Sequence, residues 1–200
     1  MKLDVRFVIG AVTIAGFGLI WLSSVWFLWR KKHKAPLYLL LFSIFFVYAY
    51  KVVDYTLLQF QSLLLLKHFK PQLRLNGLTA QASINLIPLV SLTHADLETS
   101  LLNVLLMMPF GFGLPFLVDL RMKQVVIIGA LSSISIELLQ FITGLLGGMT
   151  FRVADINDVI FNTLGVAVGY AAFAGLLHLL PVNLRWSGWH PASARVAGKS

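Results

Sequence analysis

The sequence predicts an all-α membrane protein, a polytopic helical bundle with about five transmembrane helices. Hydrophobic residues make up 58% of the 200-residue chain and charged residues only 12%, whereas about a quarter of a soluble domain is charged. The mean hydropathy is +0.83. The apolar residues form five continuous runs, each of roughly the 20 residues that cross a bilayer, without the alternation typical of a barrel.

Each apolar run predicts one helix. The runs cover about residues 7–29, 37–57, 98–118, 124–146 and 157–180. The first is too long for the apolar region of a signal peptide and predicts an uncleaved anchor. Residues 1–58 are therefore expected to hold two transmembrane helices, and residues 98–180 a three-helix core. Residues 59–97 form a long connection that contains the interfacial candidate LLQFQSLLLL, and residues 181–200 form a polar tail.

The lysine and arginine positions predict how the bundle is oriented. With the N-terminus outside, nine of these residues fall in cytoplasmic segments and six in outside segments, with Lys51 left inside a span. The densest group is RKKHK at residues 30–34. Because basic loops favour the cytoplasm, we expect an outside N-terminus, a cytoplasmic C-terminus and an extracytoplasmic 59–97 connection. The net charge of +8 is then explained by basic loops that interact with anionic lipid head groups. No nucleic acid is expected as a partner.

Polar and small residues recur at helical spacing in the three C-terminal runs. The sets are Asn103, Met107, Gly111 and Pro115 in the third run; Ser133, Glu137, Gln140 and Gly144 in the fourth; and Arg152, Asp155, Asp158, Asn162, Gly165 and Gly169 in the fifth. Each set occupies one helix face, the last one only if its helix begins near Arg152. An Asp, Arg or Lys at a membrane helix centre costs about 2.5–3.5 kcal/mol, so such residues face the bundle interior. The three faces are expected to converge on one polar pocket.

This pocket would open to the extracytoplasmic side. Its ligand-binding candidates are Asn103, Glu137, Gln140, Arg152, Asp155, Asp158 and Asn162. Glu137 and Asp158 are the candidates for a catalytic acid or base, and Arg152 suits a phosphate or carboxylate. Glu137 and the two aspartates could offer oxygen ligands to a hard cation. The five histidines are scattered and cysteine is absent, however, so we expect neither a metal nor a cofactor.

Structural roles compete for some of these residues. Asp155 could cap the fifth helix, and Asp158 could complement the dipole of that helix. Neither role explains Arg152 or Asn162 on the same face. Gly165 and Gly169 of the fifth run, in the sequence GVAVG, form a GxxxG motif that permits close helix packing. The glycines and prolines of the third run are also expected to serve packing.

Five segments occur in order within about residues 84–170, namely INLIPL, NVLLMMPFGFGLP, SISIELLQ, RVAD and DVIFNTLG. In the order of these motifs, the chain resembles the VanZ-like family of bacterial membrane proteins. Two departures are visible. Leu89 stands where the family often has an aromatic residue, and GLLGGM lengthens the turn before Phe151.

The resemblance implies a multi-pass protein of the bacterial inner membrane with a role in the cell envelope. The member that gave the family its name is associated with resistance to the glycopeptide teicoplanin, so a contribution to antibiotic resistance is one expectation. The leading hypothesis is that the chain engages a lipid-like or cell-wall ligand in the polar pocket. Three alternatives stay open: an intramembrane enzyme that modifies a lipid-linked envelope precursor with Glu137 or Asp158, a proton-coupled transporter, and purely structural polar packing.

Overall fold

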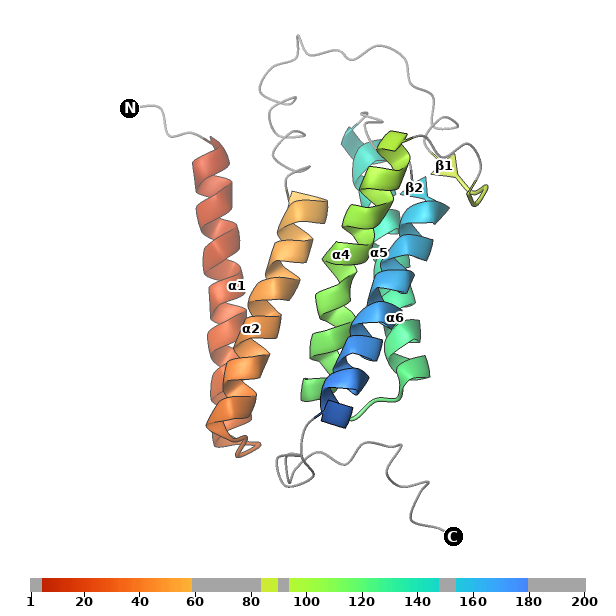
Figure 1. Cartoon of the computed structure of the whole chain (residues 1–200). Coiled ribbons are helices and arrows are strands. Elements are labelled where there is room, and N and C mark those ends of the chain that lie inside the picture. Colours follow the sequence, from red (N-terminus) through yellow and green to blue (C-terminus); the bar gives the residue numbers. More distant parts are fainter. Residues whose placement is uncertain (1–4, 59–83, 90–93, 148–153, 180–200) are drawn as a thin grey trace. The chain divides into compact units, whose positions relative to one another are not determined.

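A computed structural model describes residues 5–58, 84–89, 94–147 and 154–179 of the chain (Figure 1). Within these residues, five helices are long and apolar enough to cross a membrane, which confirms the predicted fold class. The chain divides into two compact units, Met1–Asn76 (unit 1) and Gly77–Ser200 (unit 2). Three predicted features lie outside the described residues: most of the LLQFQSLLLL segment, Arg152, and the 181–200 tail.

Unit 1 consists of two long helices joined by a tight turn. Helix α1 (Val5–Arg30) is followed by α2 (Pro36–Val53), which continues into a π-helical segment, η1 (Asp54–Leu58). Residues 31–35, which include the last four residues of RKKHK, form the turn, and His33 adopts a left-handed backbone with a φ of 50°. Pro36 then opens α2, where its fixed φ suits a first helical turn and its missing N–H costs nothing.

Aromatic side chains make the contact between α1 and α2. The Phe17 ring lies edge-on to Tyr50 with 4.8 Å between ring centroids, and 6.3 Å from the Phe46 ring in a similar arrangement. The indole N–H of Trp21 donates a hydrogen bond of 3.0 Å to the Ser43 hydroxyl. These contacts combine the dispersion energy of aromatic rings with one polar link between the helices.

Unit 2 contains three long helices and a two-stranded parallel pairing. Its helices are α4 (His94–Leu117), α5 (Met122–Gly147) and α6 (Ile156–Leu179). Helices α4 and α6 begin, and α5 ends, at the same end of the unit (Figure 1). At that end, β1 (Ile84–Asn85) pairs with β2 (Ala154–Asp155), and the register places Asn85 opposite Asp155.

Helices α4 and α6 approach so closely that their backbones touch at glycines. A Cβ atom added at Gly165 would overlap the carbonyl oxygen of Val104, and one added at Gly169 would overlap that of Met108. Gly111 of α4 makes the reciprocal close approach to the α6 backbone. The close packing predicted from the GVAVG step is therefore confirmed, and van der Waals contact between backbones holds this pair.

The apolar core of unit 2 is formed by side chains of α4, α5 and α6 that lie next to the glycine contact, on the side away from β1 and β2. Met107, Val125 and Val166 are almost fully buried and form its centre. The partly buried side chains packed against this centre are Phe110, Leu114, Leu120 and Tyr170. A second contact joins the rings of Phe116 and Phe173, whose centroids are 4.8 Å apart.

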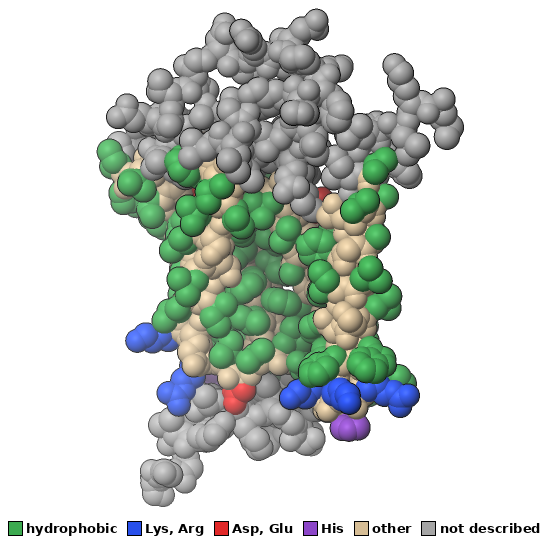
Figure 2. Space-filling view, turned by 180° about the vertical axis from the view of Figure 1, so that it is seen from behind, with side chains coloured by type: hydrophobic (Ala, Val, Ile, Leu, Met, Phe, Trp, Pro, Cys, Tyr) green, Lys and Arg blue, Asp and Glu red, His purple; other side chains and the backbone are tan. Residues whose placement is uncertain are grey.

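The outer faces of the helices are apolar. Hydrophobic side chains cover them in both units, and Lys and Arg side chains gather at helix ends (Figure 2). On α6, Ile160, Leu164 and Val168 recur at four-residue spacing and are all exposed. Such a surface is unfavourable in water and favourable in hydrocarbon, as expected of a multi-pass membrane protein.

Candidate functional site

Helix α6 begins at Ile156 rather than near Arg152. Asp155 precedes the helix in β2, and its Oδ1 accepts a hydrogen bond of 2.8 Å from the backbone N–H of Asn157. This is the bond of an N-cap residue, which keeps a non-helical backbone. The condition for a single face reaching back to Arg152 is therefore not met, and the helical face starts at Asp158. The capping role considered for Asp155 is confirmed.

Asp155 also links three elements of unit 2. Its Oδ1 accepts a second hydrogen bond, of 3.1 Å, from the side-chain amide of Asn85 on β1. Its backbone N–H donates across 3.3 Å to Oε2 of Glu137 on α5. The pairing of β1 with β2 thus places one carboxylate at the junction of β1, α5 and α6.

Asp158 and Asn103 join α4 to α6. The side-chain amide of Asn103 donates a hydrogen bond of 2.6 Å to Oδ1 of Asp158. Asp158 lies in the first turn of α6, where an acidic side chain also interacts favourably with the helix dipole. The structure thus brings together two residues that the sequence places on separate helical faces.

Glu137 faces the same region from α5 and is only 8% exposed. Gln140, one turn further along α5, is 6% exposed. Glu137 accepts from the backbone N–H of Asp155, and Asp158 lies three residues further along the chain, in the first turn of α6. We call Asn103, Glu137, Asp155 and Asp158 the carboxylate–amide cluster, and the end of unit 2 that holds it the polar end.

Below the cluster, Asn162 and Ser133 form the deepest polar contact. The amide of Asn162 donates a hydrogen bond of 2.9 Å to the Ser133 hydroxyl. Asn162 is 5% exposed, and its Oδ1 has no hydrogen-bond partner. A buried amide oxygen without a donor is unusual, because it loses hydration without compensation. The contact therefore leaves an acceptor that a water molecule or a ligand hydroxyl could satisfy.

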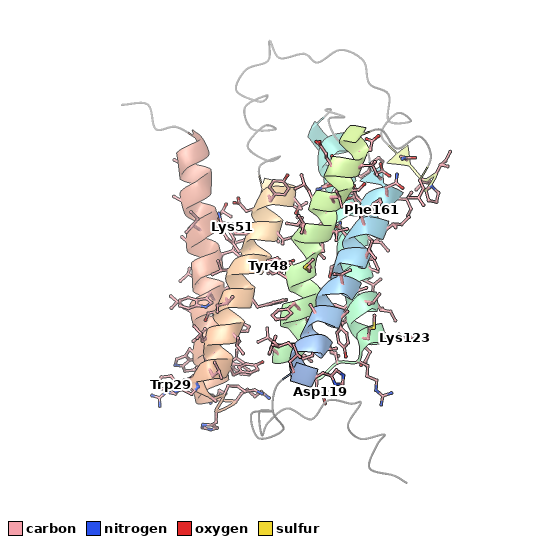
Figure 3. All side chains as sticks on the ribbon, viewed as in Figure 1. Trp29, Tyr48, Lys51, Asp119, Lys123 and Phe161 are labelled. Atoms are coloured by element: carbon pink, nitrogen blue, oxygen red, sulfur yellow. The ribbon has the colours of Figure 1, made fainter. Side chains whose placement is uncertain are left out.

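The polar interior of unit 2 does not continue through the bundle. Among its described residues, the buried polar ones are Ser100, Ser133, Glu137, Gln140, Asn157 and Asn162. They occupy the stretch from the polar end to about the middle of the helices. Beyond them, Met107, Val125 and Val166 close the interior with apolar side chains. At the end of unit 2 opposite the polar end, the labelled charged residues are Asp119 and Lys123 (Figure 3).

Sequence periodicity missed two residues that shape this region. Asn157 is 5% exposed, and its Oδ1 accepts a hydrogen bond of 2.8 Å from the backbone N–H of Leu89. It neighbours Asp158 in sequence and so falls about 100° away from the predicted face. Asn85 belongs to INLIPL but was not among the candidate site residues. The one local feature of the sequence that points to Asn157 or Asn85 is the presence of an asparagine at a turn or helix start. There its side chain commonly forms hydrogen bonds with nearby backbone groups.

The chemistry available at the cluster is hydrogen bonding between carboxylates and amides. Within the described ranges, no group of three His, Cys, Asp or Glu side chains is placed to hold a metal ion. Ser135 shows the alternative use of a polar residue, since its hydroxyl donates to the backbone oxygen of Leu131 on its own helix. The cluster residues, by contrast, connect different elements. The predicted ligand pocket and the role of Arg152 stay predictions.

Comparison with known proteins identifies the family. Searches of curated proteins and of solved structures give no match. A family model described as VanZ/LLP1 matches residues 19–179. The match covers most of the chain and includes every residue of the carboxylate–amide cluster. The chain therefore belongs to the VanZ/LLP1 family.

Proposed function

We propose that this VanZ-family membrane protein binds the polar head of a lipid-like or cell-wall amphiphile at the polar end of unit 2. The observation that carries the proposal is the carboxylate Glu137, buried inside a membrane helix and joined to Asp155 across elements. Ionisable groups are expensive within a membrane, and their retention usually marks a functional site. Packing alone would be served as well by apolar side chains.

The residues of the polar end suit a ligand rich in hydroxyl and amide groups. Carboxylates accept hydrogen bonds, while Asn and Gln side chains both donate and accept them. The buried Oδ1 of Asn162 offers an acceptor without a partner. Arg152 is three residues before Asp155 in sequence, and its guanidinium would pair with a phosphate or carboxylate of the same head group. A lipid-linked wall precursor combines these features with an acyl or prenyl chain.

Charge placement supports an extracytoplasmic location for the polar end. Arg121 and Lys123 lie at the opposite end of unit 2, beside the start of α5. Basic residues next to a span favour the cytoplasm, which directs the polar end to the outer face of a bacterial inner membrane. Glycopeptides act on cell-wall precursors at that face. A contribution to teicoplanin-type resistance is therefore compatible with the proposal and can be measured beside it.

A charge-matched comparison tests the proposal in cells. A deletion strain is complemented with wild type, Glu137→Gln or Glu98→Gln, and its lipids, wall precursors and teicoplanin susceptibility are measured. Glu98→Gln makes the same chemical change at an exposed position of α4. We expect Glu98→Gln to restore the wild-type profile and Glu137→Gln to fail despite normal membrane insertion. Full complementation by Glu137→Gln would rule out a functional role for its carboxylate.

An intramembrane enzyme is the second candidate, and a specific observation favours it. Glu137 of α5 and Asp158 of α6 both lie at the polar end, where Asp158 accepts from the Asn103 amide and Glu137 from the Asp155 backbone N–H. Two carboxyl groups at one end of the unit supply a candidate acid and a candidate base. An enzyme should convert a component of a lipid extract in detergent and lose this activity in Glu137→Gln. A binder should be stabilised by the unchanged ligand.

The transporter alternative is weaker on structural grounds. Proton-coupled transport through unit 2 would need polar groups beyond Asn162, where the described core is closed by Met107, Val125 and Val166. A pH-dependent flux in vesicles containing the purified chain, lost in Glu137→Gln, would nevertheless establish transport and displace the binding proposal.

A further inference from the structure

A short apolar turn follows β1 and projects from the polar end of unit 2. It consists of residues 86–89, and we call it the apolar turn. Leu86 is 72% exposed, Ile87 61% and Leu89 56%, and Pro88 is exposed as well. Four consecutive apolar residues without apolar cover are unfavourable in water. The binding site proposed above makes no use of them.

The apolar turn is fixed in position by hydrogen bonds. The backbone N–H of Ile87 donates across 3.2 Å to Oδ1 of Asn85, whose amide in turn donates to Asp155. At the other end of the turn, the backbone N–H of Leu89 donates to Oδ1 of Asn157. Leu89 has a φ of 59°, a left-handed conformation that a bulky residue rarely adopts. Specific contacts therefore hold the backbone of the turn at both ends.

These contacts also determine the depth of the turn relative to α6. Asn157 is the second residue of α6, and the candidate span begins at Ile156. Because Leu89 is bonded to Asn157, the apolar turn lies beside the first turn of that span (Figure 1). Exposed Ile160 and Leu164 continue the apolar surface along α6 into the membrane. A membrane span that begins at Ile156 would put the turn at the level where hydrocarbon gives way to head groups.

We propose that the apolar turn inserts into the interfacial layer of the bilayer, with membrane lipid as its partner. Lipid at this depth removes Leu86, Ile87 and Leu89 from water, in the way that amphipathic segments bury an apolar face at the acyl boundary. The inserted turn is joined to Asp155 of the carboxylate–amide cluster through Asn85, and to the start of α6 through Asn157. This inference does not depend on which ligand the cluster binds.

The absence of cysteine from the sequence allows a direct depth measurement on the 200-residue chain. Single variants Ile87→Cys, Leu164→Cys and Lys31→Cys are spin-labelled in phosphatidylglycerol–phosphatidylethanolamine vesicles. Collision with oxygen, which concentrates in lipid, is compared with collision with a water-soluble nickel chelate. Leu164 is on the exposed α6 face, and Lys31 is in the exposed basic turn of unit 1.

We expect the oxygen-to-nickel ratio of the Ile87 label to exceed that of the Lys31 label several-fold and to approach that of the Leu164 label. A ratio equal to that of Lys31 would show that the turn is in water. Low collision rates with both reagents would show that protein covers it. Either of these results overturns the proposal.

A second comparison tests whether Asn157 holds the turn at this depth. In the Ile87→Cys background, Asn157→Ala removes the acceptor for Leu89, while Asn157→Asp retains a side-chain oxygen there. We expect Asn157→Ala to increase label mobility and lower the oxygen-to-nickel ratio several-fold, and Asn157→Asp to preserve both. An unchanged ratio in Asn157→Ala would refute the anchoring by Asn157. Native helix content in both variants, measured by circular dichroism, separates this effect from misfolding.

Discussion

The described glycines of α1 and the glycines at the contact between α4 and α6 occupy opposite environments although all lie in apolar helices. Around Gly10, Gly16 and Gly18 of α1, a Cβ atom would meet nothing within 4 Å. At Gly165 and Gly169 of α6, it would overlap the α4 backbone. A glycine in a membrane helix therefore determines packing where a second element occupies the space that a side chain would fill.

The polar contacts of the two units also differ, although Trp21 of α1 does donate to Ser43 of α2. In unit 1, Ser23 and Ser24 donate to backbone oxygens of their own helix. In unit 2, Asn103 and Asn162 donate to side chains on other helices. The buried share of the spans agrees, at 0% for the first and 28% for each of the last two. Within the described residues, inter-helix polar specificity is concentrated in unit 2, which explains why the candidate site lies there.

The glycine comparison predicts the largest effect on stability. Gly165→Ala should lower the free energy of unfolding of unit 2 by about 3 kcal/mol, at the upper end for overpacking, because the obstacle is backbone. Gly16→Ala, where space is open, should change stability by no more than about 0.5 kcal/mol. Hydrogen exchange resolved by peptide in detergent measures both. Equal protection of α4 and α6 in Gly165→Ala and wild type would mean that the helices do not approach as closely as described.

The polar comparison predicts an intermediate effect. Asn103→Ala removes the donor to Asp158 and should destabilise unit 2 by about 1.5 kcal/mol, as expected for a hydrogen bond to a charged group. Ser23→Ala removes only a bond to its own helix and should be nearly neutral. Thermal unfolding of the purified variants in one detergent gives the comparison. A larger loss for Ser23→Ala than for Asn103→Ala would reverse the roles of the two units.

The fold could be predicted from the sequence because membrane insertion imposes a simple length requirement. A run of about 20 apolar residues must form a helix to satisfy its backbone in lipid, and all five runs do so. The start of the last helix was also close, since the run predicted from residue 157 begins at Ile156. A single polar face back to Arg152 was predicted only if that helix began near Arg152, and the Asp155 side chain, which accepts from the Asn157 N–H, keeps Asp155 outside the helix.

The candidate site could be predicted only as far as helical periodicity reaches. Period 3.6 placed Asn103, Glu137 and Asp158 on inward faces, and the structure shows them at one end of unit 2. Periodicity is silent about residues outside helices. The contact of Asn85 with Asp155 joins positions 70 residues apart and depends on a strand pairing that only tertiary structure reveals.

A double replacement separates stability from function in unit 2. Ser133→Ala combined with Asn162→Leu removes the deepest polar pair and its unpartnered oxygen together. Because both partners become apolar, the stability of unit 2 should stay the same or rise by up to about 1 kcal/mol. Complementation of the deletion strain should nevertheless fail if the polar interior receives a ligand. Loss of stability and retention of function together would indicate that the pair serves packing alone.

The smallest effect is expected at the polar contact of unit 1. Trp21→Phe keeps an aromatic ring but removes the N–H that donates to Ser43. Inter-helix hydrogen bonds in membrane proteins contribute about 0.6 kcal/mol on average, and the Trp21 contact is only partly buried. A double-mutant cycle with Ser43→Ala, measured by SDS-driven unfolding, should therefore give a coupling near that value. The same cycle on Asn103 and Asp158 gives the coupling energy for unit 2. A larger coupling energy for Trp21 with Ser43 than for Asn103 with Asp158 would contradict the contrast between the units. It would mean that polar contacts specify the pairing of α1 with α2 more strongly than the pairing of α4 with α6.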